Sequence, residues 1–243
     1  MSAALQSYAE LVLRAERGVD YDITVSDRGA TVTVLALHGG GIAPLTGELA
    51  TEIAGEWYNL YLLRSLRAAG NEALRLPSLR YSELRCDGLL SRSTLALAVT
   101  GAAGCTDDDA PIQVSGQSEH LVAALMTALT AAGFAAKAST SRVERLALQC
   151  YNRAQQGGAV LALPWGLRQS LVAVDLQPDA VAGTGEHTTR WHTLVGAVRQ
   201  GIGDGLLAQS SDLAMTLARF ERTTRAAQAA GLLGPGARRH MPR

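Results

Sequence analysis

Residues 31–44 read TVTVLALHGGGIAP, an apolar and β-branched run that ends in a histidine and three glycines. Such a run predicts a buried strand over 31–37, and the glycines that follow it let the backbone turn sharply or approach a ligand closely. Residues 46–54 have helical spacing, and 58–63 have the pattern of a second strand. The stretch therefore predicts a strand–helix–strand unit in which His38 lies at a strand end.

Strand and helix patterns alternate along most of the remaining chain. The further elements expected are strands at 93–100, 159–163 and 171–176 and helices at 118–132 and 189–202. This alternation favours an α/β fold with a mixed, mostly parallel sheet and helices on both faces. We expect this domain to span residues 1–205, with a helical extension over 206–233 and a disordered tail over 234–243.

The composition excludes several classes of protein. The 243 residues carry 22 basic and 22 acidic side chains, so the net charge is zero, and aromatic residues make up 5%. A dedicated nucleic-acid binder needs a basic face and a single-strand binder needs aromatic platforms, so neither is expected. No apolar run approaches the ~18–20 residues of a membrane span. Only Lys137 is a lysine among the basic residues, and this bias, with the alanine content, is typical of GC-rich coding as in actinobacteria.

The N-terminus and the cysteines favour a cytoplasmic location. Four apolar residues share one face of an expected N-terminal helix: Leu5, Tyr8, Leu11 and Val12. This pattern lacks the basic start and apolar core of a secretory signal. The chain has three cysteines: Cys86, Cys105 and Cys150. Their spacing is unlike that of any metal motif, which favours reduced cysteines that pack in the core.

Several ordered motifs lie along the chain, at 18–21, 27–29, 38–44 with 46–50, 150–153 and 157–168. These motifs resemble those of the poly-γ-glutamate hydrolase family of phages and bacilli, and the resemblance runs from about residue 8 to residue 202. It implies the zinc carboxypeptidase-like fold of that family, and the helix expected after residue 205 lies beyond the resemblance.

The zinc-site positions implied by the resemblance are mostly replaced. In the family, the zinc ligands are the histidine before the glycines, a glutamate five residues on and a histidine at a later strand end. Here these positions hold His38, Ala43 and Thr100, and the family's general-base glutamate corresponds to Ala162. A catalytic zinc needs about three protein ligands, so no metal and no cofactor are expected. A rebuilt zinc site would need other side chains, and the candidates are Glu48, Asp107 to Asp109, and Glu186 with His187.

The replacements also suggest what the pocket binds. Ala43, Thr100 and Ala162 remove charge and mostly remove volume, so we expect a larger and less polar pocket. The resemblance implies that Arg153 grips a substrate carboxylate, a contact that arginine makes in a bidentate way. His38 is a candidate general acid or base, and Arg153 is the second candidate catalytic residue. The other candidate ligand-binding residues are Asn152, Trp165, Tyr81 and Arg80.

Three functions fit this sequence. The first is a metal-independent biosynthetic enzyme of the cyclase or isomerase type, which holds a largely apolar ligand with a carboxylate or carbonyl in a reactive shape. The second is a catalytically inactive binding or regulatory protein. The third is a working zinc amidase or peptidase that cleaves γ-glutamyl-type amide bonds. The expected partner is a small molecule rather than a nucleic acid or a membrane.

The pattern of residues 211–232 predicts a long helix. This helix either docks on the domain or forms a homodimer.

Overall fold

The computed structural model describes residues 4–102, 110–177, 181 and 185–229. It divides into one unit that ends at Gly205 and a second that begins at Leu206, and helix α6 (Thr189–Ala229) runs through both. The sheet and all the candidate site residues lie in the first unit. The expected tail over 234–243 lies outside the described residues.

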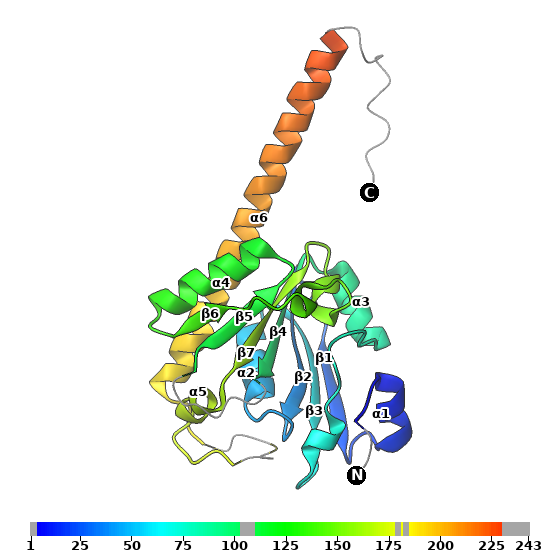
Figure 1. The fold of residues 1–243 in the computed structure, drawn as a ribbon, viewed down its shortest axis with the longest axis vertical. Helices are drawn as coiled ribbons and strands as arrows, with labels where there is room; N and C mark the ends of the chain where they lie inside the picture. Colours follow the sequence, from blue (N-terminus) through cyan, green and yellow to red (C-terminus); the bar gives the residue numbers. More distant parts are fainter. Residues whose placement is uncertain (1–3, 103–109, 178–180, 182–184, 230–243) are drawn as a thin grey trace. The chain divides into compact units, whose positions relative to one another are not determined.

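A mixed sheet forms the centre of the first unit, and within the described residues it has seven strands in the order β1-β3-β2-β4-β7-β5-β6 (Figure 1). The strands are β1 (Tyr21–Ser26), β2 (Val32–Gly40), β3 (Asn59–Ser65), β4 (Leu95–Gly101), β5 (Ile112–Gly116), β6 (Ala136–Ala138) and β7 (Gly158–Leu163). The central strands β3, β2, β4 and β7 are parallel, whereas β1 and β5 run antiparallel to β3 and β7. The predicted mixed, mostly parallel sheet is confirmed, and β2, β4 and β7 end at the same edge.

The glycines that follow His38 are the last residues of β2, where this strand lies very close to its neighbour β3. Gly40 has a φ of +64°, and a Cβ at this position would lie 2.1 Å from the carbonyl oxygen of Ser65. Only glycine fits such a close approach of two backbones. The register between β2 and β3 also shifts between Ala36 and Gly39. This irregular strand end places His38 at the edge of the sheet.

One face of the sheet is covered by α2 (Thr46–Ala54), α4 (Glu119–Ala131) and the part of α6 before Leu206. Gly47 of α2 lies against the side chain of Leu62 on β3. Gly201 of α6 lies against the backbone of Leu125 on α4, which brings these two helices unusually close. Among the described residues, no helix combines the length and apolar character needed to cross a bilayer.

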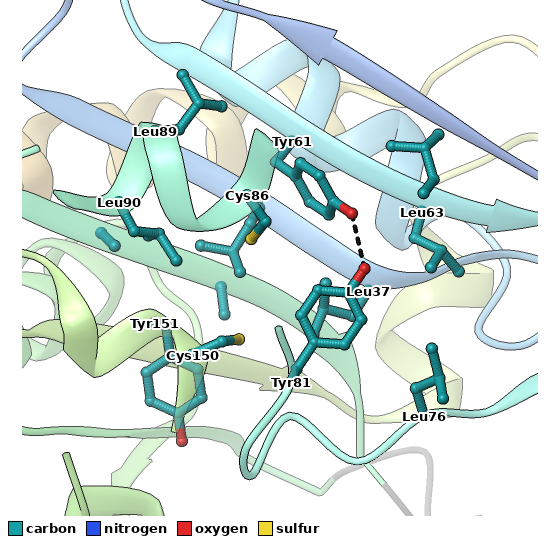
Figure 2. Close-up of a cluster of buried hydrophobic side chains, with 14 of the residues drawn as sticks. Leu37, Tyr61, Leu63, Leu76, Tyr81, Cys86, Leu89, Leu90, Cys150 and Tyr151 are labelled. Carbon is teal, nitrogen blue, oxygen red and sulfur yellow. Dashed lines mark hydrogen bonds between the residues drawn. The ribbon is translucent and has the colours of Figure 1, made fainter. Parts of the chain in front are cut away.

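The opposite face carries the main apolar cluster, beneath α1 (Tyr8–Arg14) and α3 (Leu84–Arg92). The short 3₁₀ turns η1 (Asn71–Leu74), η2 (Val143–Arg145) and η3 (Cys150–Arg153) and the short helix α5 (Trp165–Ser170) complete the described elements. Figure 2 shows Tyr61 of β3 pointing toward Tyr81, and their hydroxyl oxygens are 2.6 Å apart. Cys86 and Cys150 are free and buried in the same cluster, as expected, whereas Cys105 lies outside the described residues.

Two expected elements differ in the structure. Residues 171–176 form no strand, although Leu171, Val172 and Leu176 are buried, and their only ladder contact is an isolated bridge between Val172 and His187 among the described residues. Because β7 already pairs with β4 and β5, a strand that follows it finds no free edge there. The separate helices expected at 189–202 and 211–232 are one continuous helix, α6, up to Ala229, the last residue described there. Gly201 and Gly205 lie within this helix, against Leu125 and Leu121 of α4.

Candidate functional site

His38 lies at the end of β2 with both ring nitrogens hydrogen bonded. Nε2 is 2.7 Å from the carbonyl oxygen of Leu76, and Nδ1 is 2.8 Å from the hydroxyl oxygen of Thr100. A carbonyl only accepts, so Nε2 carries the proton, and the Thr100 hydroxyl donates to Nδ1. This arrangement leaves no ring lone pair for a metal ion or for accepting a substrate proton.

The surroundings of His38 favour its neutral form. Burial lowers its pKa from 6.5 to about 4, and the nearby Arg75 guanidinium acts in the same direction. The carbonyl of Leu76 opposes this shift only in part. At neutral pH the imidazole is therefore uncharged, which agrees with the tautomer that its two hydrogen bonds require.

The three positions at which this chain departs from the zinc site implied by the resemblance lie near one another, where β2, β4 and β7 end. Thr100 of β4 and Ala162 of β7 are paired in register, and both are partly exposed. Ala43 is buried in the loop after β2, and a Cβ built on Gly101 would lie 3.1 Å from the Cβ of Ala43. The structure thus brings together Ala43, Thr100 and Ala162 around the strand ends, next to His38.

The cavity beside His38 is small. Its volume is about 40 Å³, enough for a few water molecules. The residues that line it are Leu37, His38, Ser78, Ala98, Val99, Thr100, Cys150, Tyr151 and Val160. Among the candidate ligand-binding residues, only Thr100 belongs to this lining. In this conformation the cavity is small and mostly apolar, and neither Ala43 nor Ala162 lines it.

Arg168 is a site residue that the sequence reasoning missed. It follows β7 on α5, and it is 6% exposed. Its Nη1 donates to the carbonyl oxygen of Pro44 at 2.9 Å, whereas its Nε is buried without a hydrogen-bond partner. A Cβ on Gly101 would lie 3.1 Å from its Nη2, so the guanidinium adjoins the replaced zinc positions. No carboxylate among the described residues pairs with it.

The charge of Arg168 is costly where it lies. Burial, with the neighbouring Arg75 guanidinium, lowers the pKa of Arg168 to about 10. The guanidinium carbon lies 4.9 Å from the centre of the Trp165 ring, which gives Trp165 a packing role beneath the cation. A buried cation without a counter-ion is unfavourable and is typical of a site for an anionic group. In the sequence, the only indication that Arg168 belongs to the site was its position at the end of the last motif that resembles the family.

Arg153 is turned away from the cavity beside His38. Its Nη1 lies 2.5 Å from Oδ1 of Asp87 on α3, and its Nη2 donates to the carbonyl oxygen of Tyr81. These contacts tie η3 to α3 and to the chain before it. Arg153 therefore joins elements of the domain in this structure, and it does not share a cavity lining with His38.

The other candidate residues are placed mainly by local contacts. The Asn152 amide donates to the carbonyl oxygens of Glu144 and Leu146, and its oxygen accepts from the backbone of Gln117. Tyr81 is buried in the core cluster, where its hydroxyl meets that of Tyr61. Arg80 is exposed, with a φ of +59°. None of these three side chains lines the cavity beside His38.

The donor set at this edge does not fit the zinc ion that the resemblance implies. His38 has no free nitrogen, Ala43 offers only a methyl group, and Thr100 uses its hydroxyl to donate to His38. Within the described ranges, no three His, Cys, Asp or Glu side chains come together in a group that could hold a metal ion. Glu48, Glu52 and His187 line one cavity on another face of the sheet, but they are not grouped so that they could hold a metal ion. Asp107 to Asp109 lie outside the described residues.

The fold and the site define a mixed α/β protein with helices on both faces and its candidate site at the ends of three parallel strands. The family model described as poly-γ-glutamate hydrolase matches residues 5–182. The chain therefore belongs to the poly-γ-glutamate hydrolase family, and the resemblance noted in its motifs is confirmed.

Two proteins of Bacillus subtilis (strain 168) are similar in sequence. The chain is 35% identical to UPF0714 protein YndL over 117 residues, which are 48% of this chain and 45% of YndL. It is 32% identical to the SPbeta prophage-derived UPF0714 protein YoqZ over 137 residues, which are 56% of this chain and 48% of YoqZ. These matches span about half the length of either relative.

Two solved structures have the same fold. A bacteriophage poly-γ-glutamate hydrolase superposes with a TM-score of 0.73 at 22% identity, over 82% of this chain and 96% of that chain. A zinc-free apo structure of YndL superposes with a TM-score of 0.74 at 24% identity, over 82% of this chain and 97% of that chain. The predicted fold class is thereby confirmed.

Proposed function

We propose that this chain is a metal-independent member of its family that binds a carboxylate-bearing ligand where β2, β4 and β7 end. The observation that carries the proposal is the commitment of both His38 nitrogens, to Leu76 and to Thr100. With alanine at positions 43 and 162, this edge offers neither a set of zinc ligands nor a carboxylate base. Water activation of the kind used by zinc hydrolases therefore has no support from these side chains.

The class of ligand follows from the unpaired arginine. Arg168 places a buried guanidinium beside Ala43 and Gly101, with no carboxylate partner among the described residues. Arg75 lies near enough to affect the pKa of Arg168. Poly-γ-glutamate, named for the phage relative, is a chain of carboxylates joined by amide bonds. A short γ-glutamyl molecule would supply the anion that Arg168 lacks.

Of the two metal-independent alternatives, the site geometry favours a binding or regulatory protein. An acid–base enzyme needs a group with a free lone pair or a transferable proton near the ligand, and His38 uses both its nitrogens for internal contacts. A cyclase or isomerase that acts on a largely apolar ligand stays a prediction from the sequence. A small-molecule ligand and a cytoplasmic location are also part of this proposal.

Binding and turnover of a γ-glutamyl tetramer test the proposal. Calorimetry with the full chain is expected to give saturable binding that a chelator leaves unchanged, with no new amine ends after incubation with zinc. Arg168→Met should weaken this binding about tenfold or more, because the anion loses a charge-assisted contact. Arg92→Met, which changes a 60% exposed arginine, is the matched control and should bind as the parent does. Zinc-dependent release of amine ends would overturn the proposal.

A further inference from the structure

The loop that follows β2 is held by two guanidinium groups. Nη1 of Arg168 donates to the carbonyl oxygen of Pro44 at 2.9 Å, and Nη2 of Arg75 donates to the carbonyl oxygen of Ile42 at 3.2 Å. Two residue steps of extended chain span at most about 7 Å, so both arginines reach the same short stretch of the loop. The Arg75 charge is also close enough to lower the pKa of Arg168. Arg75 therefore lies beside the anion site proposed for Arg168.

Both guanidinium groups keep a donor that the protein does not use. Arg75 uses Nε and Nη2 for internal contacts, and its Nη1 makes no hydrogen bond within the described residues. Nη2 of Arg168 makes none there either, and it adjoins the partly exposed Gly101. The side chain of Arg75 is 33% exposed, so a ligand can approach it from solvent.

Glu72 occupies Arg75 in this structure. Its carboxylate pairs with Nε of Arg75 and accepts from Nη2 at 2.9 Å. The Glu72 side chain is 69% exposed, and ion pairs on such exposed side chains are weak. A ligand carboxylate beside Arg168 would face two cations, so it can compete with Glu72 for Arg75.

The charges of this cluster leave room for one more anion. Arg75 and Arg168 bring two positive charges, and among the described residues the pair with Glu72 offsets only one of them. His38, whose pKa also responds to the Arg75 charge, is neutral at pH 7 and adds none. One further carboxylate would balance the cluster.

We propose that Arg75 and Arg168 together hold one carboxylate of the ligand, and that this carboxylate displaces Glu72 from Arg75. Glu72 is then an internal competitor that occupies Arg75 until the ligand binds. The inference rests on the proposed function, since it adds a second contact and a competing group to the same anion site.

Calorimetry of the full chain with the γ-glutamyl tetramer tests this assignment through two substitutions with opposite effects. Arg75→Met should weaken binding about tenfold, because the carboxylate loses a charge-assisted contact. Glu72→Gln should strengthen binding about two- to fivefold, because the competing carboxylate is removed. If the pair were merely structural, breaking it from either side would change binding in the same direction. Arg92→Met and Asp27→Asn break another exposed ion pair, of 2.6 Å, and should bind as the parent does.

The double variant shows whether Glu72 acts through Arg75. Adding Glu72→Gln to Arg75→Met should give little further gain, whereas an equal gain in both backgrounds would mean that Glu72 acts through its charge alone and would contradict the displacement. Unchanged binding in Arg75→Met, or unchanged or weaker binding in Glu72→Gln, would overturn the inference. If Arg75→Met does not fold, Glu72→Gln decides.

Failure of this inference is distinct from failure of the proposed function. If the tetramer binds the parent and Arg168→Met weakens that binding while Arg75→Met does not, only the role of Arg75 is wrong. If the tetramer binds neither the parent nor Glu72→Gln up to about 20 mM, both proposals are overturned.

Discussion

His38 shows how one substitution changes the chemistry of its neighbour. Thr100, at the position where the resemblance implies a histidine ligand, supplies a hydroxyl that donates to Nδ1 of His38 at 2.8 Å. The carbonyl of Leu76 takes the proton on Nε2. A residue type suited to metal binding thereby becomes a partly buried, neutral hydrogen-bonding group that joins β2 to β4 and to the segment after η1.

Burial of neutral His38 makes folding depend on pH. The pKa of His38 is about 4 in the folded chain and about 6.5 when unfolded, so the unfolded chain binds more protons between these values. The free energy of unfolding should therefore fall by about 2 to 3 kcal/mol as the pH drops from 7 to 4. Urea unfolding across this range measures it. In His38→Gln the slope should be smaller, and an identical slope would show that His38 does not cause it.

Arg168 and Arg153 should respond oppositely to the same substitution. Arg168→Met removes a buried cation that has no counter-ion, so it should raise the free energy of unfolding by about 1 to 3 kcal/mol without ligand. Arg153→Met breaks the contacts with Asp87 and Tyr81 and should lower it by about 1 to 3 kcal/mol. Urea unfolding of both variants tests the pair. Destabilisation by Arg168→Met would show that its bond to Pro44 dominates.

At the level of elements, the contact between α4 and α6 depends on where glycine lies. A Cβ on Gly201 would lie 2.9 Å from the Cα of Leu125, whereas Gly203 has nothing within 4 Å. Gly201→Ala should therefore destabilise the domain by about 1 to 3 kcal/mol. Gly203→Ala should stabilise it by about 0.5 to 1 kcal/mol, because alanine favours the helix. Thermal unfolding compares the two, and equal shifts would contradict this close packing.

The strongest apolar patterns predicted their elements well, and weaker ones did not. The helix at 46–54 was predicted to the residue, and the central strands β2, β3, β4 and β7 were predicted within a few residues, because their side chains are buried on both faces. The strands β1, β5 and β6 were missed, since they are short or mix polar residues and lie toward the sheet's edges. The run at 171–176 has the pattern of a strand, but it follows β7, which already pairs with β4 and β5.

The sequence predicted only those site residues that lie within short, recognisable motifs. His38 and the replaced positions follow from motifs on consecutive residues, and the structure groups them at one edge. Arg168 was missed because its burial depends on Pro44 and Gly101, which come from distant parts of the chain. The family resemblance assigned Arg153 to a substrate carboxylate, and its pairing with Asp87 on α3 could not be read from the sequence.

For the whole molecule, the part of α6 after Gly205 is expected to form a homodimer. Leu213, Leu217 and Phe220 are spaced four and three residues apart, so they share one face of the helix, and all three are exposed. Sedimentation equilibrium of the full chain should give a dimer. Leu213→Glu with Leu217→Glu should give a monomer with an unchanged melting temperature of the domain. A monomeric parent chain would contradict the prediction.

The central claim is that this member of the family works without metal. The zinc content of the untagged protein tests this claim most directly. The chain should be purified without a histidine tag, incubated with excess zinc, desalted and measured by elemental analysis. The side chains at positions 38, 43, 100 and 162 predict well under 0.1 zinc per chain, because a stable site needs about three protein ligands. About one zinc per chain, lost on treatment with a chelator, would contradict the account.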